Sequence, residues 1–231
     1  NPLTPIQLSV QRLRRRYLDK IEDDGTFGES TEIILKEVDA LKTLVNEFSS
    51  FARLPETKKS IEDLNDIVVE AVNLFKVAHE AITFDLNLLI EMPKMQLDKS
   101  QLKRVLFNLF DNSVAAMNLA GNIEVVTELD SDSQKIKLSV SDEGCGIDPE
   151  VYNQLFEPYF SMREGGTGLG LAIVKRIVSD HGASVKAIAN QNRGTRFVIE
   201  FPSGLQITKD PNKRTLKIEA QDLEVEKNEW C

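Results

Sequence analysis

Apolar residues recur every three or four positions in two stretches near the start of the chain, residues 3–17 and residues 34–52. This spacing puts the apolar side chains of each stretch along one seam of a helix. Between the stretches, residues 22–29 carry the glycines and short polar side chains of a turn, and Ser30 or Thr31 is suited to cap the second helix. The pattern therefore predicts an antiparallel helical hairpin.

The two predicted helices present narrow apolar seams that cannot fully bury each other. A second copy that completes a four-helix bundle would cover both seams, so we expect a homodimer through the hairpin. Pro55 cannot continue the second helix and marks a hinge, followed by the short polar linker 56–60. Residues 1–55 are therefore predicted to form one domain.

The rest of the chain alternates between helical and extended patterns, and residues 56–202 are predicted to form a second domain. Helices are expected at 63–77, 98–119 and 149–156 and after the glycine run near 170, and strands at 81–90, 123–129, 135–141, 185–188 and 195–201. Mixed strands with helices on one side give a two-layer α/β sandwich, so the fold class is α+β. The polar tail 203–231 carries one predicted strand at 215–219 and suggests no function.

Composition and charge narrow the function classes. The net charge of -9 argues against affinity for nucleic acid or anionic membranes, and the basic run 12–16 is interpreted as a solvated helix surface. Cys145 and Cys231 have no metal or disulfide spacing, which favours a reducing, cytoplasmic setting. No apolar run approaches the roughly 20 residues that span a bilayer. The start at Asn1 suggests an excerpt of a longer protein, which leaves a membrane-anchored parent open.

A glycine run leads directly into the apolar, helix-periodic stretch 172–178. It reads Glu-Gly-Gly-Thr-Gly-Leu-Gly-Leu over residues 164–171. Glycines let the backbone approach a polyphosphate closely, and the N–H groups and dipole of the following helix favour anionic oxygens. Nucleotide binding is therefore the leading hypothesis. A dinucleotide fold is disfavoured, because Ile173 stands where that motif requires a small residue.

Three further groups of residues suit a nucleotide site. Asn108 and Asn112 lie four apart on one helix face and can offer oxygen ligands to a hard cation, although such a pair is also common on surfaces. Asp142 directly follows a predicted strand and begins the run Asp-Glu-Gly-Cys-Gly, so its carboxylate could accept from an exocyclic amine, although a plain turn has the same pattern. Gly194 and Thr195 offer a close backbone approach and a hydroxyl.

The order and spacing of these groups resemble the N, G1, F, G2 and G3 boxes of the histidine-kinase ATP-binding domain, within the wider GHKL ATPase superfamily. The resemblance covers residues 63–202, and the aromatic run 155–160 takes the place of the F box. Residues 1–6, Asn-Pro-Leu-Thr-Pro-Ile, resemble the segment after the phosphoacceptor in the family pattern His-Glu-x-x-Asn-Pro-Leu. Residues 159–168 look most like nitrogen-regulation sensor kinases.

The resemblance implies ATP and Mg2+ as cofactors and gives roles to individual residues. It implies that Asn112, with Asn108, coordinates Mg2+, that Asp142 accepts from the adenine amine, and that residues 160–166 form a mobile lid. It also implies that Arg163, in the lid, can reach the terminal phosphate. The other implied positions are Gly144, Gly146 and Ile147 in the adenine pocket, Phe160 and Gly166 in the lid, and Thr167, Gly168, Leu169, Gly170 and Thr195 near the phosphates.

By the same resemblance, the phosphoacceptor histidine would lie four residues before Asn1. His79 and His181 are not expected to replace it, because each has a structural interpretation near a helix end. We therefore expect the chain to bind ATP without autophosphorylating. The Asn1 position implies a part in dephosphorylating the regulator, and capping of the first helix before Pro2 is the alternative.

The expected function is transfer of the γ-phosphoryl group of Mg-ATP to a histidine and then to an aspartate on a response regulator receiver domain. Gln7, Gln11 and Arg14 are candidates for the regulator-docking surface. A GHKL ATPase of the chaperone, gyrase or mismatch-repair type and a serine kinase acting on anti-sigma partners share the site but lack the hairpin. A scaffold with a degenerate site is a further alternative. Cys145 is interpreted as a small filler rather than a redox-sensitive thiol.

Overall fold

The computed structural model describes residues 3–18, 20, 25–52, 56–130, 132–163, 166–190, 193–202 and 215–218. Contacts between Cα atoms divide the chain into two compact units. One comprises Asn1–Pro55 with Tyr159–Leu169, and the other comprises Glu56–Pro158 with Gly170–Cys231. Pro55 and most of the tail 203–231 lie outside the described residues.

The first unit contains helix α1 (Leu3–Tyr17) and helix α2 (Thr26–Ala52). The two helices run antiparallel, because Gln7 bonds Asp39 at 3.0 Å while Arg14 pairs with Glu32 at 3.6 Å. Among the residues of the predicted seams, Val10 and Val38 are buried. These two valines mark where α1 and α2 bury apolar surface.

The start of α2 corrects the sequence-based prediction, because Ser30 and Thr31 lie inside the helix and do not cap it. The buried Thr31 hydroxyl donates to the carbonyl oxygens of Phe27 and Gly28, at 2.8 and 3.0 Å. A hydroxyl that bonds back into the preceding turn is satisfied within a helix. The region that reads as a turn up to residue 29 is therefore helical from Thr26 onward.

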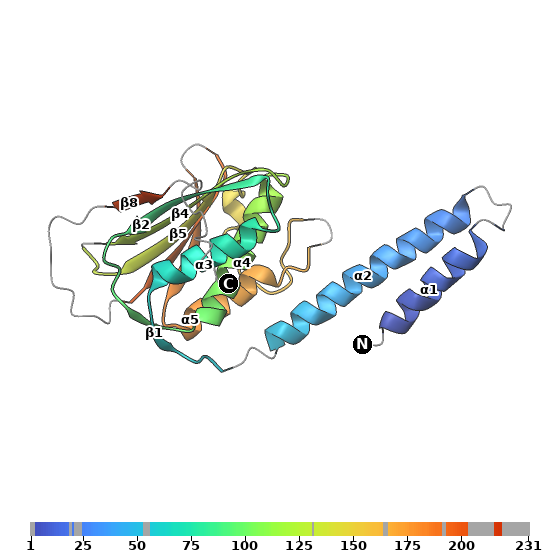
Figure 1. The fold of residues 1–231 in the computed structure, drawn as a ribbon, viewed down its shortest axis with the longest axis horizontal. Helices are drawn as coiled ribbons and strands as arrows, with labels where there is room; N and C mark the ends of the chain where they lie inside the picture. Colours follow the sequence, from blue (N-terminus) through green and yellow to red (C-terminus); the bar gives the residue numbers. More distant parts are fainter. Residues whose placement is uncertain are drawn as a thin grey trace, which may run out of the picture. The chain divides into compact units, whose positions relative to one another are not determined.

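The second unit is built on a six-stranded sheet, seen behind three helices in Figure 1. The strand order is β6-β7-β5-β4-β2-β8, and only the β2–β4 pair is parallel. The strands are β2 (Ile82–Leu89), β4 (Gly121–Leu129), β5 (Ile136–Asp142), β6 (Ser184–Ala189), β7 (Thr195–Phe201) and β8 (Thr215–Ile218). The predicted mixed sheet, with its two hairpins and the strand in the tail, is confirmed.

Helices α3 (Leu64–Lys76), α4 (Lys99–Ala116) and α5 (Gly170–Asp180) cover one face of this sheet (Figure 1). Asp63 caps α3 through the backbone N–H of Asn65, and Asp98 caps α4 through Ser100 and Gln101. These carboxylates satisfy N–H groups that the first helical turn leaves without partners. The core is apolar, with Phe84 and Phe110 in edge-to-face contact at 5.0 Å between ring centroids.

Three shorter features differ from the predictions. The helix expected at 149–156 is one 3-10 turn, η1 (Pro149–Val151), followed by further turns. Helix α4 ends at Ala116, and Asn118 and Leu119 have φ of 54° and 73°, which a helix cannot continue through. Strands β1 (Ser60–Glu62) and β3 (Met95–Leu97), which pair antiparallel with each other, were not predicted from the sequence.

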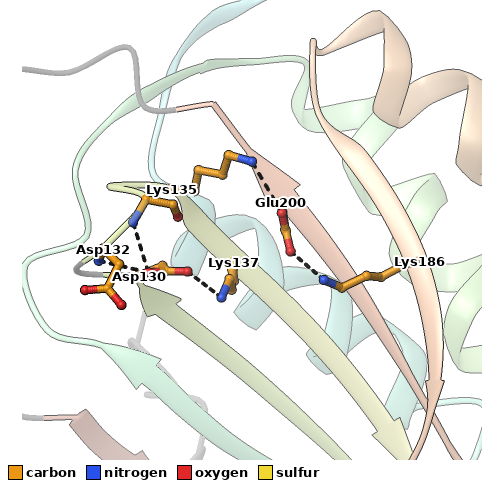
Figure 2. Close-up of polar contacts among 7 residues, drawn as sticks. Asp130, Asp132, Lys135, Lys137, Lys186 and Glu200 are labelled. Carbon is orange, nitrogen blue, oxygen red and sulfur yellow. Dashed lines mark hydrogen bonds and ion pairs between the residues drawn. The ribbon is translucent and has the colours of Figure 1, made fainter.

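The other face of the sheet is polar. Lys137 pairs with Asp130 at 2.6 Å, and Glu200 pairs with Lys186 at 2.8 Å and with Lys135 at 3.5 Å. Figure 2 shows how these side chains lie on the sheet. The lysine partners lower the pKa of both carboxyl groups, with Lys137 the largest cause for Asp130 and Lys186 for Glu200. Because these groups are solvent-accessible, each pair adds little stability. These ion pairs leave this face of the sheet in contact with solvent, so the apolar side chains are buried on the face that the helices cover.

Candidate functional site

The two predicted metal-binding amides project from the middle of α4, and both side chains are half-buried. The Asn108 amide nitrogen donates to the carbonyl oxygen of Arg104 at 2.8 Å. Its oxygen lies beside the start of α5, since a Cβ added at Gly170 would come within 2.9 Å of it. Within the described part of the chain, the Asn112 side chain makes no hydrogen bond. Both amide oxygens are therefore free to bind a ligand.

Asp142, at the end of β5, is held by neutral donors from three different segments. One carboxylate oxygen, Oδ1, accepts from the backbone N–H groups of Gly144, at 2.9 Å, and Thr195, at 3.1 Å. The other, Oδ2, accepts from the Ser113 hydroxyl of α4 at 3.3 Å. Asp142 is 2% exposed, and its own carbonyl oxygen accepts from the Asn190 side chain at 2.9 Å. The carboxylate is thus both buried and fixed in orientation.

The burial of this carboxylate changes its acidity. Burial raises the pKa of Asp142 above its ordinary value, because desolvation disfavours the charged form. The bonds from Gly144, Thr195 and Ser113 act in the opposite direction and lower the pKa. A carboxylate kept against such a desolvation cost is typical of functional sites, although structural networks also produce it.

Glycines let three backbone segments meet around Asp142. A Cβ added at Gly144 would lie 2.6 Å from the Ala116 Cβ, and the next N–H, of Cys145, donates to the Ala116 carbonyl at 3.2 Å. Gly194 has a φ of +91°, and a Cβ there would overlap the Asp142 carbonyl oxygen. The loop after β5 therefore packs closely on the end of α4 and on the turn before β7.

The predicted lid, 160–166, and the predicted phosphate residues Thr167, Gly168 and Leu169 belong to the first unit, in the segment Tyr159–Leu169, which has internal bonds of its own. The Tyr159 N–H donates to the Gly168 carbonyl at 3.0 Å, and the Leu169 N–H donates to the Thr167 hydroxyl at 3.4 Å. Arg163 is exposed, and its N–H donates to the Ser161 hydroxyl at 3.1 Å. These bonds close the segment into a loop, of which residues 164 and 165 lie outside the described residues.

The structure brings together some of the predicted site residues and not others. Asp142, Gly144 and Thr195 are in direct contact, and Asn108 lies beside Gly170. The other predicted positions are placed as follows: Gly146 and Ile147 lie in the half-buried loop after β5, Phe160 is half-buried, Gly166 is exposed, Leu169 is buried, and Asn1 lies outside the described residues. Ser113 and Asn190 were missed, because nothing in their local sequence indicates that they contact Asp142.

Both histidines have structural roles. His181 is buried, with Nε2 accepting from the Asp98 N–H at 2.9 Å and Nδ1 bonded to the Ile177 carbonyl at 2.7 Å. His79 stacks on Phe75, with 4.0 Å between ring centroids. In the described ranges, no group of three or more His, Cys, Asp or Glu residues could hold a metal ion. Cys145 is exposed, which argues against its interpretation as a small filler.

Comparison with known proteins identifies the family. Residues 97–205 match the family described as histidine kinase-, DNA gyrase B-, and HSP90-like ATPase. The catalytic domain of the histidine kinase ThkA is 30% identical, with a TM-score of 0.56 over 63% of this chain and 95% of that one. The chain belongs to the sensor histidine kinases. This kinase chain is also 34% identical to the nitrogen regulation protein NtrY of Azorhizobium caulinodans, over 80% of its length and 25% of that protein.

The resemblance to histidine kinases inferred from the sequence is therefore confirmed, and it supports ATP as the nucleotide. The histidine kinase chain spans less than half the length of the curated relatives it matches. Solved structures that it resembles include a complex of ThkA with the response regulator protein TrrA, at 27% identity and a TM-score of 0.65 over 87% of this chain and 57% of that one. In the described part of the kinase, no helix is long and apolar enough to cross a membrane.

Proposed function

We propose that this chain is the kinase core of a two-component sensor, which binds Mg-ATP, supports phosphorylation of a histidine and passes the phosphoryl group to a response regulator aspartate. In this proposal residues 56–202 bind ATP and residues 1–55 form the dimerisation and phosphotransfer hairpin. The observation that carries the proposal is the Asp142 carboxylate, buried yet held as an acceptor by Ser113, Gly144 and Thr195. Such a group can read the exocyclic amine of adenine.

The amides of α4 fit Mg2+. Asn112 has no hydrogen-bonding partner among the described residues, and Asn108 uses only its nitrogen, so each can offer an oxygen. Mg2+ prefers oxygen ligands and commonly takes one or two from protein when phosphates supply others. Bound Mg2+ would neutralise charge on the phosphates. In the proposed site, Asn112 and Asn108 would hold the ion, and the Asn108 oxygen lies beside Gly170 at the start of α5.

The glycine run and its flanking residues are assigned to the phosphates. The N-terminus of α5 at Gly170 offers backbone N–H groups and the positive end of the helix dipole. Thr167, Gly168 and Leu169 lead into it, and Thr195 lies on the Asp142 side. Residues 160–166 are assigned to the lid, and Arg163 is assigned to contact with the terminal phosphate. Phosphoryl transfer mainly requires positioning and charge neutralisation, which these groups supply.

The phosphoacceptor is assigned to a histidine outside the printed sequence, four positions before Asn1. His181 has both ring nitrogens engaged, and His79 is stacked on Phe75, so neither is a good nucleophile. The 231-residue chain is thus proposed to bind ATP without autophosphorylating. Asn1 is assigned to the dephosphorylation of the regulator. We assign the domain to the cytoplasm, where ATP is supplied.

A response regulator receiver domain is the proposed partner, as TrrA is for ThkA in the solved complex. Gln11 and Arg14 line an open depression on the hairpin together with Arg15, Leu18 and Leu35. This surface combines donors with apolar area, as protein interfaces do. The net charge of -9 disfavours nucleic acid as an alternative partner.

Replacing Asn112 tests the proposed metal site. We expect Asn112→Ala to weaken binding of Mg-AMPPNP at least about tenfold, because one of two protein oxygens for the metal is lost. Calorimetry with Mg2+ and then with EDTA separates the metal-dependent part of the AMPPNP affinity from the rest. In Asn112→Ala only the metal-dependent part should fall. Asn153→Ala, at an exposed asparagine, is the matched control. No uptake of AMPPNP by the unaltered chain in the presence of Mg2+ would refute the proposed function itself.

A charge placed on the apolar seam tests the homodimer. Ile6, Leu13, Leu41, Val45 and Phe48 remain 43–48% exposed in the single chain. We expect Leu41→Glu to convert a dimer into monomers, because the carboxylate would be buried without a partner in the four-helix bundle. Light scattering after gel filtration gives the mass. Thr43→Glu adds the same charge off the seam and should stay dimeric, whereas a monomeric unaltered chain would contradict the dimer.

Nucleotide binding should weaken on acidification. The folded-state pKa of Asp142 is raised, so its carboxylate loses its charge at a pH above the ordinary value of about 3.9. A protonated carboxyl cannot accept from all its donors, so ADP affinity should fall as the pH drops through that raised pKa. The ratio of ADP to IDP affinity removes the phosphate titration, which both nucleotides share, and the same ratio measured for Asp142→Asn gives the part that comes from protonation of adenine N1. A ratio that falls with pH to the same extent in the unaltered chain and in Asp142→Asn would contradict the role of Asp142.

A further inference from the structure

Ser113 occupies a position on α4 that none of the proposed ATP contacts uses. It follows Asn112 and is 0% exposed, although it carries a hydroxyl. A buried hydroxyl needs a hydrogen-bonding partner, and this one lies 3.3 Å from Oδ2 of Asp142. Because an ionised carboxylate only accepts, the hydroxyl is the donor.

The acceptor capacity of Asp142 is almost fully used by the protein. A carboxylate offers about four lone-pair positions, two on each oxygen. On Oδ1, the N–H groups of Gly144 and Thr195 take both. On Oδ2, Ser113 takes one, and none of the other described residues donates to that oxygen. One acceptor position is therefore left for a ligand, on an oxygen that Ser113 orients.

Charged groups do not interfere with this arrangement. The groups that contact the carboxylate come from α4, from the loop after β5 and from β7, and all are neutral. The next residue along the chain, Glu143, is exposed. The Arg196 guanidinium is engaged by the Ser141 hydroxyl at 2.9 Å and by the Glu124 carboxylate at 3.4 Å. Ser113 is thus the only side-chain donor to the Asp142 carboxylate among the described residues.

We propose that Ser113 is a positioning residue that directs the last acceptor position of Asp142 at the amine of a 6-amino purine and keeps the carboxylate in its acceptor form. The inference rests on the proposed function, in which Asp142 reads adenine. A 6-oxo purine presents an oxygen at the same place, and two acceptors repel each other. Ser113 therefore contributes to the selection of adenine over hypoxanthine nucleotides.

Loss of the hydroxyl should weaken ADP binding selectively. In Ser113→Ala, Oδ2 loses its orienting donor, and we expect about a five- to tenfold loss of ADP affinity. IDP has no amine to donate to Oδ2 of Asp142, so its affinity should change less than about twofold. Because the Ser113 bond favours the charged carboxylate, its removal should also move the midpoint of the ADP pH profile upward. A purely structural role would weaken both nucleotides alike and leave this midpoint in place.

A graded series and a matched control complete the experiment. Ser113→Cys keeps a weak donor of similar size and should give ADP affinity between those of the serine and alanine forms. Ser139→Ala removes another buried serine hydroxyl, on β5, and should leave both nucleotides unaffected. Thermal melting of each variant shows that it is folded, and alanine is favourable within α4.

The outcomes separate the two proposals. An unaltered chain that binds ADP, with a Ser113→Ala variant that binds ADP equally well or loses ADP and IDP alike, overturns the role of Ser113 and leaves the kinase function intact. An unaltered chain that binds neither nucleotide overturns both. Selective loss of ADP with an upward shift in the pH midpoint supports Ser113 as the positioning residue.

Discussion

Asp142→Asn should bind adenine nucleotide at least about 100-fold more weakly than the unaltered chain, because a charge-assisted bond is replaced by two opposed donors. The carboxamide oxygen can replace Oδ1 and accept from Gly144 and Thr195, and its nitrogen can donate to the Ser113 oxygen. That nitrogen then also faces the adenine amine, which is a donor as well. Calorimetry with Mg-ADP measures the loss.

The same substitution should leave the fold as stable as before or more stable. Burial raises the folded-state pKa of Asp142 above its unfolded value, so the ionised form lowers stability at any pH above both values. An uncharged asparagine removes that cost while keeping the three bonds. The melting temperature without nucleotide should therefore stay equal or rise, which is the opposite of a simple folding defect.

Asp148→Asn is the matched control for Asp142→Asn. Asp148 is exposed and caps the short η1 turn, with its carboxylate accepting from Glu150 at 3.0 Å. Asparagine is also a good cap, so neither affinity nor melting temperature should change much. An Asp142→Asn variant that melts earlier, or that binds Mg-ADP within about threefold of the unaltered chain, would contradict the site as described.

Much of the ATP-binding unit could be predicted from the sequence, because its elements are long and their local signals agree. Helices α3 and α4 begin at capping aspartates, Asp63 and Asp98, and continue with a regular apolar pattern. Strands β4 and β5 alternate around a turn-forming segment. By contrast, β1 and β3 have three residues each, too few to show a period, and exist through their pairing with each other.

The prediction of where α2 begins was wrong for a different reason. Gly28, Ser30 and Thr31 are residues typical of turns, yet the Thr31 side chain is buried and its hydroxyl is satisfied within the helix. Packing along the helix thus overrides a local preference that is small, up to about 1 kcal/mol per residue. Such an outcome depends on neighbours that the local sequence does not show.

The residues of the candidate site likewise divide into those that the sequence predicts and those that it does not. Glycines, paired asparagines and a strand-end aspartate can be recognised from residue type and spacing, because few other roles require them together. Ser113 could not be recognised, since its contact depends on how α4 sits against the end of β5. Asn190 is similar, because its side chain reaches the Asp142 carbonyl from the turn before β7. The sequence therefore predicts the ligand-facing groups better than those that hold them.

Gly194 is the backbone position on which this arrangement most depends. Its φ is +91°, and a Cβ there would overlap the Asp142 carbonyl oxygen and lie 2.7 Å from Oδ1. We expect Gly194→Ala to lower the free energy of unfolding by about 2–5 kcal/mol, from left-handed strain of about 1–2 kcal/mol plus the cost of overpacking. Urea denaturation measures this loss. Nucleotide binding should fall as well, because relief of the overlap displaces Asp142.

Gly182→Ala separates the cost of backbone strain at positive φ from the cost of steric overlap with Asp142. Gly182 follows α5 with a φ of +71°, but a Cβ there meets nothing closer than Pro202 at 3.9 Å. Its replacement should therefore cost only the backbone strain of about 1–2 kcal/mol and leave nucleotide affinity unchanged. If the two variants lose equal stability and both still bind ADP normally, the contact between Gly194 and Asp142 does not hold the carboxylate in place. A larger loss for Gly194→Ala, together with lost binding, would show that the turn before β7 determines the position of Asp142.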